Sequence, residues 1–359
     1  MSDEHSTEPQ PSHEYARALA LTFIAPHLPD DLKATAFGIA RGLQDNAARV
    51  RALSGLARSL LGAECDAMLY EALGIARSIS NGWLRTRSLI FISARTSGEI
   101  KSDVLREAFD TASSIDNEWL RGRALEMVMN RLPDEWLDRK LAAAQSITIE
   151  SMRASALSSL SAHLPAEMKR QLLNDALHIA DEWTRALMLK SLADHLPNAL
   201  IDQAIVIARA IQDRAPRLLA LSSLAQRLPQ PAKDDLLHEA LTSAQAITDD
   251  NSSRVETLTT LIDQLPDEWK DTATQDALAA ARAIADNNLR AQWLNDLIDH
   301  VPKAVKASVL AEALTAARSI DDPDSRAEAL SVLIDRLAED QRSEVVYEIM
   351  KLMQNTTMN

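Results

Sequence analysis

Ten arginines recur along the sequence at intervals of 32–37 residues, and each guanidinium could hold a carboxylate or a phosphate through several charged donors in one plane. They are Arg17, Arg49, Arg85, Arg121, Arg153, Arg185, Arg217, Arg254, Arg290 and Arg326. Each is followed four residues later by leucine and seven residues later by Ile, Leu or Val, which places the arginine on the apolar face of a helix. A guanidinium held there needs acceptors, so we expect a structural clamp between adjacent repeats. A ladder that grips an anionic ligand is the alternative.

Aromatic side chains occupy the position two residues before the arginine in four repeats. They are Tyr15, Trp83, Trp119 and Trp183. Two residues correspond to about 200° around a helix, which turns these side chains away from the apolar face. They either cover the loops between repeats or form an exposed contact patch, because aromatic residues often anchor protein interfaces. Our leading hypothesis places a partner-binding surface at this column.

Acidic and imidazole side chains form two further columns. Asp263, Asp299 and Asp335 follow the arginine by nine residues in the last three repeats, as an acidic stripe for a basic partner or an ordinary solvated surface. The next position is His27, His163, His195 or His300 in four repeats. Helices stack about 10 Å apart, whereas zinc–nitrogen bonds are about 2 Å long. We therefore expect no metal site and no cofactor.

Catalytic motifs are missing from the sequence. It contains no GxSxG, P-loop, GxGxxG, HExxH or CxxC pattern. Nothing else in it meets the geometric requirements of a reaction centre. We expect no enzymatic activity.

The columns belong to helices that repeat along the chain. Asp or Asn stands four residues before the arginine in eight repeats and can cap the first turn, while proline ends the helix in seven. A second helix follows, as in residues 232–247. The pattern predicts an all-α fold, an α-solenoid of about ten helix-turn-helix repeats of 32–37 residues. The repeats start near residues 15, 47, 83, 119, 151, 183, 215, 251, 288 and 324 within a single domain over 14–353. An acidic disordered tail over 1–13 and a short tail over 354–359 complete the expected organisation.

The order EALxxARSI followed by RAxALSSLAxxLP resembles tetratricopeptide and HEAT-type α-solenoids, although most repeats lack the tetratricopeptide Gly and Tyr of the first helix. The resemblance implies a right-handed superhelix that holds peptides or protein domains. In bacteria it also implies a signalling or defence assembly.

The composition limits the kinds of partner that we expect for this protein. A net charge of -14 argues against nucleic acid, and the single Cys65 cannot form an internal disulfide. The polar first twelve residues and the lack of an apolar run of about 18 residues predict a cytoplasmic protein that does not enter membranes. The apolar stretch EVVYEIMKLM either seals the stack or supports a homodimer.

We therefore expect a non-catalytic scaffold or adaptor that binds a protein domain or peptide. A regulatory or sensor subunit for a small anionic ligand and a self-assembling rod are the alternatives.

Overall fold

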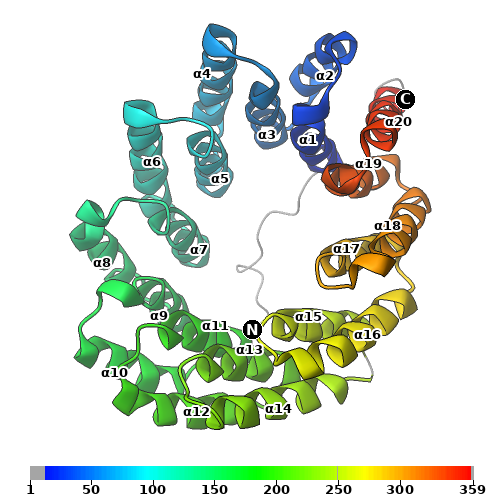
Figure 1. The fold of residues 1–359 in the computed structure, drawn as a ribbon. Coiled ribbons are helices and arrows are strands. Elements are labelled where there is room, and N and C mark those ends of the chain that lie inside the picture. The colour runs from blue at the N-terminus through cyan, green and yellow to red at the C-terminus, as the bar shows by residue number, and fades with distance from the viewer. Residues whose placement is uncertain (1–12, 249, 357–359) are drawn as a thin grey trace, which may run out of the picture. The chain divides into compact units, whose positions relative to one another are not determined.

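Helices account for every regular element in the part of the chain that the computed structural model describes, residues 13–248 and 250–356 (Figure 1). The prediction of an all-α fold is confirmed for these residues. The predicted tail over 1–13 lies outside them except for His13, which begins the first helix. Residues 354–356 of the second predicted tail belong to the last helix, and residues 357–359 lie outside.

Two kinds of helix alternate along the chain. The odd-numbered A helices carry the recurring arginines: α1 (His13–Ile24), α3 (Asn46–Leu56), α5 (Gly82–Ser93), α7 (Glu118–Met129), α9 (Glu150–Ser158), α11 (Glu182–Ala193), α13 (Arg214–Ala225), α15 (Asn251–Ile262), α17 (Asn287–Leu297) and α19 (Pro323–Leu333). The even-numbered B helices follow them: α2 (Asp30–Gly42), α4 (Gly62–Ser78), α6 (Gly98–Ser113), α8 (Leu137–Gln145), α10 (Ala166–Ala176), α12 (Ile201–Arg209), α14 (Ala232–Gln245), α16 (Asp267–Ala283), α18 (Lys303–Arg318) and α20 (Glu339–Thr356). Short 3-10 turns follow or precede several of them: η1 (Ala25–His27), η2 (Ala57–Ser59), η3 (Asp134–Trp136), η4 (Ser161–His163), η5 (Asn198–Leu200) and η6 (Ile334–Arg336).

The A helices begin where the capping residues predict. Seven of the eight Asp or Asn side chains accept hydrogen bonds from main-chain N–H groups of the first turn. Asp213 is the exception, because its side chain makes no such bond. A cap of this kind stabilises a helix by about 1 kcal/mol.

The core is built from leucines of the A helices and alanines of the B helices. The leucine four residues after each recurring arginine is 0–8% exposed in all ten cases. Each B helix from α2 to α18 contributes an alanine near its end that is 0% exposed, from Ala40 to Ala317. Full burial of one leucine contributes about 1.5–3 kcal/mol, and the small alanines let neighbouring helices approach closely.

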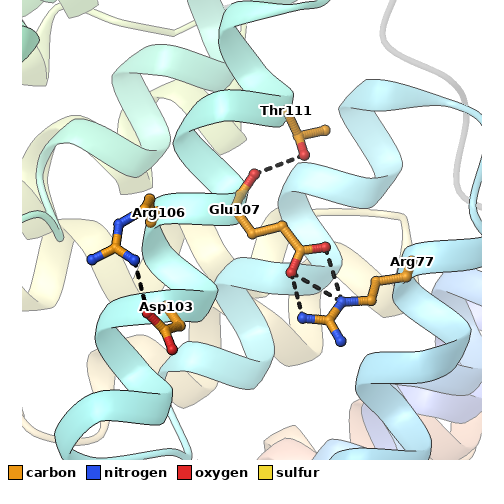
Figure 2. A network of polar contacts seen from close by, with 5 residues as sticks. All are labelled: Arg77, Asp103, Arg106, Glu107 and Thr111. Atoms are coloured by element: carbon orange, nitrogen blue, oxygen red, sulfur yellow. Dashed lines mark hydrogen bonds and ion pairs between the residues drawn. The ribbon is translucent and has the colours of Figure 1, made fainter.

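Successive B helices are joined by ion pairs between residues that are 30 positions apart. Arg77 of α4 lies 2.8 Å from Glu107 of α6 (Figure 2). The same pairing occurs in Arg41–Glu71, Arg209–Glu239 and Arg318–Glu348, at 2.7–2.9 Å. At these four junctions, an arginine of one B helix therefore connects to a glutamate of the next.

The chain divides into two compact units. Unit 1 contains the described residues up to Leu132 and from Leu310 onward, and unit 2 contains Pro133–Val309. In unit 2, the A helices from α9 to α17 contact one another in sequence order. In unit 1, α3 contacts α1 and α5, and α5 contacts α7.

The two ends of the chain pack together inside unit 1. Helix α1 contacts α19 as well as α3, and α2 contacts α20 (Figure 1). The apolar face of α20 is buried there, with Val345, Val346, Ile349, Met350 and Met353 at most 2% exposed. The first and last repeats therefore pack against each other within unit 1. No helix among the described residues combines the length and the apolar character that a bilayer span requires.

Candidate functional site

Most of the recurring arginines bind the main chain. Eight of the ten donate to the carbonyl oxygen six residues earlier, just after the preceding B helix, at distances that include 2.7 Å for Arg85 and Ile79 and 3.1 Å for Arg217 and Ile211. The last carbonyl groups of a helix have no partner within it, and a cation also interacts favourably with that end of the helix dipole. These bonds connect each B helix to the following A helix.

The other two arginines have carboxylate partners. Arg254 lies 3.9 Å from Asp276, while Arg17 in the first A helix donates from Nε to Oδ1 of Asp324 at 2.7 Å. The Arg17 and Asp324 side chains are 13% and 4% exposed. Because Asp324 belongs to α19, this buried ion pair connects the last repeat to the first.

A second polar contact shows that the first and last repeats are aligned with each other as two successive repeats are. His27 Nε2 of the first repeat lies 2.6 Å from Asp335 of the last. His300 Nδ1 lies 3.3 Å from Asp263 of the preceding repeat, so the same two columns are in contact in both places. All three aspartates of the predicted acidic stripe are exposed, and Asp263 and Asp335 lie against histidines.

The tryptophan column does not form one surface. Trp83 is 2% exposed, so the interpretation of this residue as part of an exposed contact patch is wrong. Neighbouring helices cover it even though it points away from the apolar face of its own helix. Trp119 is half-buried, and Trp183 is 38% exposed but belongs to unit 2. Of the four predicted aromatics, the structure brings together Tyr15 and Trp83.

Arginines that the sequence analysis did not single out surround these two aromatics. Arg87 Nη2 donates to the Tyr15 hydroxyl at 2.9 Å, and its Cζ lies 5.4 Å from the Tyr15 ring and 5.9 Å from the Trp83 ring. Arg51 Cζ lies 3.8 Å above the Phe91 ring and 5.9 Å from the Tyr15 ring. We call Tyr15, Arg51, Arg87 and Phe91 the arginine–aromatic cluster.

Helical spacing places the cluster on one stripe of the A helices. Its members stand two residues before, two after or six after the recurring arginine, and residues four apart lie on the same side of a helix. Tyr15 comes from α1, Arg51 from α3, and Arg87 and Phe91 from α5. One signal in the sequence could have revealed the cluster. In three successive repeats a second arginine stands two residues after the recurring one: Arg51, Arg87 and Arg123.

The cluster has an excess of positive charge. Among the described residues, no carboxylate lies within ion-pair distance of Arg51 or Arg87. Burial lowers the pKa of the Arg51 guanidinium, and the neighbouring charge of Arg87 lowers it further. Within the same described part, Arg51 Nε is buried without a hydrogen-bond partner. Buried donors without acceptors are costly, so this arrangement favours an anionic oxygen.

Glu328 is the acidic side chain whose charge acts on Arg51. Burial raises the pKa of its carboxyl group, while the positive charge of Arg51 lowers it. Glu328 belongs to α19, so the electrostatic environment of the cluster depends on contact between the two ends of the chain.

No protein-family model and no curated protein matches this sequence.

Proposed function

We propose that this chain is a non-catalytic binding protein, an α-solenoid of ten tetratricopeptide-like or HEAT-like hairpins, that binds an acidic segment of another protein at the arginine–aromatic cluster. The alternating A and B helices, the recurring arginines and the repeated B-helix ion pairs support the repeat assignment.

The observation that carries the binding proposal is the pair Arg51 and Arg87. Both guanidinium groups lie against the Tyr15 ring, and neither has a carboxylate partner among the described residues. A carboxylate that reaches them would form charge-assisted hydrogen bonds, which are about twice as strong as neutral ones. The Tyr15 and Phe91 rings supply apolar contact for the rest of the segment.

The contacts of the recurring arginines favour a protein segment as the ligand over a small anion bound along the arginine column. Eight of these arginines already donate to main-chain carbonyls, so these guanidinium groups are held against the protein's own main chain. The scaffold or adaptor hypothesis is therefore favoured over a sensor that reads an anion through this column.

The proposal is tested with an array of acidic peptides and a fluorescence anisotropy titration of those that bind. The double variant Arg51→Gln, Arg87→Gln should weaken binding by about tenfold or more, because each lost charged hydrogen bond contributes about 1.5–3 kcal/mol. Binding of the wild-type chain should also weaken with added salt.

Arg123→Gln is the matched control. Arg123 occupies the same position of the next repeat but already donates to Glu126 at 3.1 Å, so its loss should leave binding within about twofold. Equal losses in the control and the double variant would reject the cluster as the binding site.

A further inference from the structure

A pocket opens to solvent within unit 1, between α4, the end of α5 and the start of α6. Leu69, Leu73, Ile92 and Ile100 give the pocket an aliphatic wall. None of the four residues of the arginine–aromatic cluster lines it.

The pocket lies where the repeat pattern fails. Eleven residues after the recurring arginine, nine repeats have Leu or Val, and the third repeat has Thr96. Seven of those nine side chains are buried, with exposures of 2–6%. Thr96 is shorter and lines the pocket instead, so space that a leucine fills in other repeats is left open here.

Two opposite charges line this pocket without pairing. Arg95 and Asp66 both face it, and within the described residues neither has an ion-pair partner, including each other. Arg95 Nη1 donates to the Phe91 carbonyl oxygen at 3.1 Å, but its Nε is buried with no partner in that part of the chain. Burial lowers the pKa of the Arg95 guanidinium, and the charges of Arg51 and Arg58 lower it further.

Further donors lie beside Arg95. Ser97 is the N-cap residue of α6, yet its side chain makes no capping bond. Thr96 and Ser97 line the pocket together with Arg95, and the Thr96 hydroxyl already donates to the Ile92 and Ser93 carbonyl oxygens at 3.4 Å. One end of the pocket therefore suits a carboxylate, and Asp66 supplies a partner for a cation.

We propose that this pocket binds an aliphatic α-amino acid, with the carboxylate at Arg95 and Ser97, the ammonium group at Asp66 and the side chain against Leu69 and Ile92. One positive and one negative side chain complement a zwitterion better than they complement a singly charged molecule. The aliphatic wall selects an apolar side chain. This site is independent of the proposed protein-binding function and would remain if that function were rejected.

The test is a calorimetric titration of the full chain with leucine and with two analogues that each lack one charge, isocaproate and isoamylamine. Leucine should bind saturably at millimolar concentrations or below. Each analogue should bind about tenfold more weakly or worse, since it leaves one charged group of the pocket without its hydrogen bonds. No heat from leucine, isoleucine or valine, or equal binding of isocaproate, would overturn the proposal.

Two variants locate the site. Thr96→Leu restores the side chain of the other repeats and fills the pocket, so leucine binding should be lost while the melting temperature stays equal or rises. Arg95→Gln should weaken binding by about tenfold or more.

Arg131→Gln is the control for the Arg95 variant. Arg131 is the equivalent residue of the next repeat, and it donates to the Met127 carbonyl oxygen at the same 3.1 Å, but it does not line the pocket. Its loss should leave leucine binding unchanged. Full binding in a folded Thr96→Leu variant would place the ligand elsewhere and reject this site.

Discussion

Glu328 and Arg51 are charged side chains held in surroundings that disfavour charge. Burial is the largest influence on both, and it raises the pKa of Glu328 and lowers that of Arg51. A carboxyl group with a raised folded-state pKa stabilises the fold at low pH, below its unfolded-state pKa. That contribution is lost as the pH rises through the folded-state value.

Glu328→Gln should therefore raise the melting temperature at neutral pH. The glutamine keeps the shape of the protonated side chain and removes the cost of a buried negative charge. Below the ordinary pKa of glutamate, where the wild-type group is protonated, the two proteins should melt alike. Thermal unfolding followed by circular dichroism at both pH values checks this. A variant that melts lower at neutral pH would mean that attraction to Arg51 outweighs burial.

At the scale of the helical element, eight of the recurring arginines link two helices through the carbonyl oxygen six residues earlier. Arg85→Ala removes the 2.7 Å bond to the Ile79 carbonyl at the end of α4. We expect the free energy of unfolding to fall by about 1–3 kcal/mol, which is the cost of leaving a buried polar group without a hydrogen bond. Urea unfolding measures this change, and Arg58→Ala, at an exposed arginine without a carbonyl bond, should cost about 0.5 kcal/mol or less. Unchanged stability in Arg85→Ala would reject the clamp.

The helical elements could be predicted because the signals that define them are local. Leucine spacing identified the buried face of every A helix, and the Asp and Asn caps marked where most of them begin. The environment of Trp83 could not be predicted, because burial depends on neighbouring helices as well as on the face of its own helix. The arginine–aromatic cluster was missed for a related reason. Its residues come from three helices, and spacing along one helix does not show which side chains converge.

At the scale of the whole chain, unit 1 depends on contact between the two ends of the sequence. Asp324→Ala leaves Arg17 buried without its partner, and loss of one member of a buried ion pair costs about 3–5 kcal/mol. Urea unfolding should show this loss. Asp321→Ala, at an exposed position three residues earlier, should change stability by about 0.5 kcal/mol or less. Equal small effects of the two variants would show that the Arg17–Asp324 pair does not hold α1 to α19.

The contact between α1 and α19 also determines how the molecule carries a mechanical load. A force that pulls the two ends of the chain apart acts first within unit 1, because helices from both ends belong to it. Unit 2 is connected to unit 1 through the chain on both sides and is shielded from that tension while α1 and α19 remain in contact. The Arg17–Asp324 pair thus lies at the point that must yield before the remaining repeats are stretched.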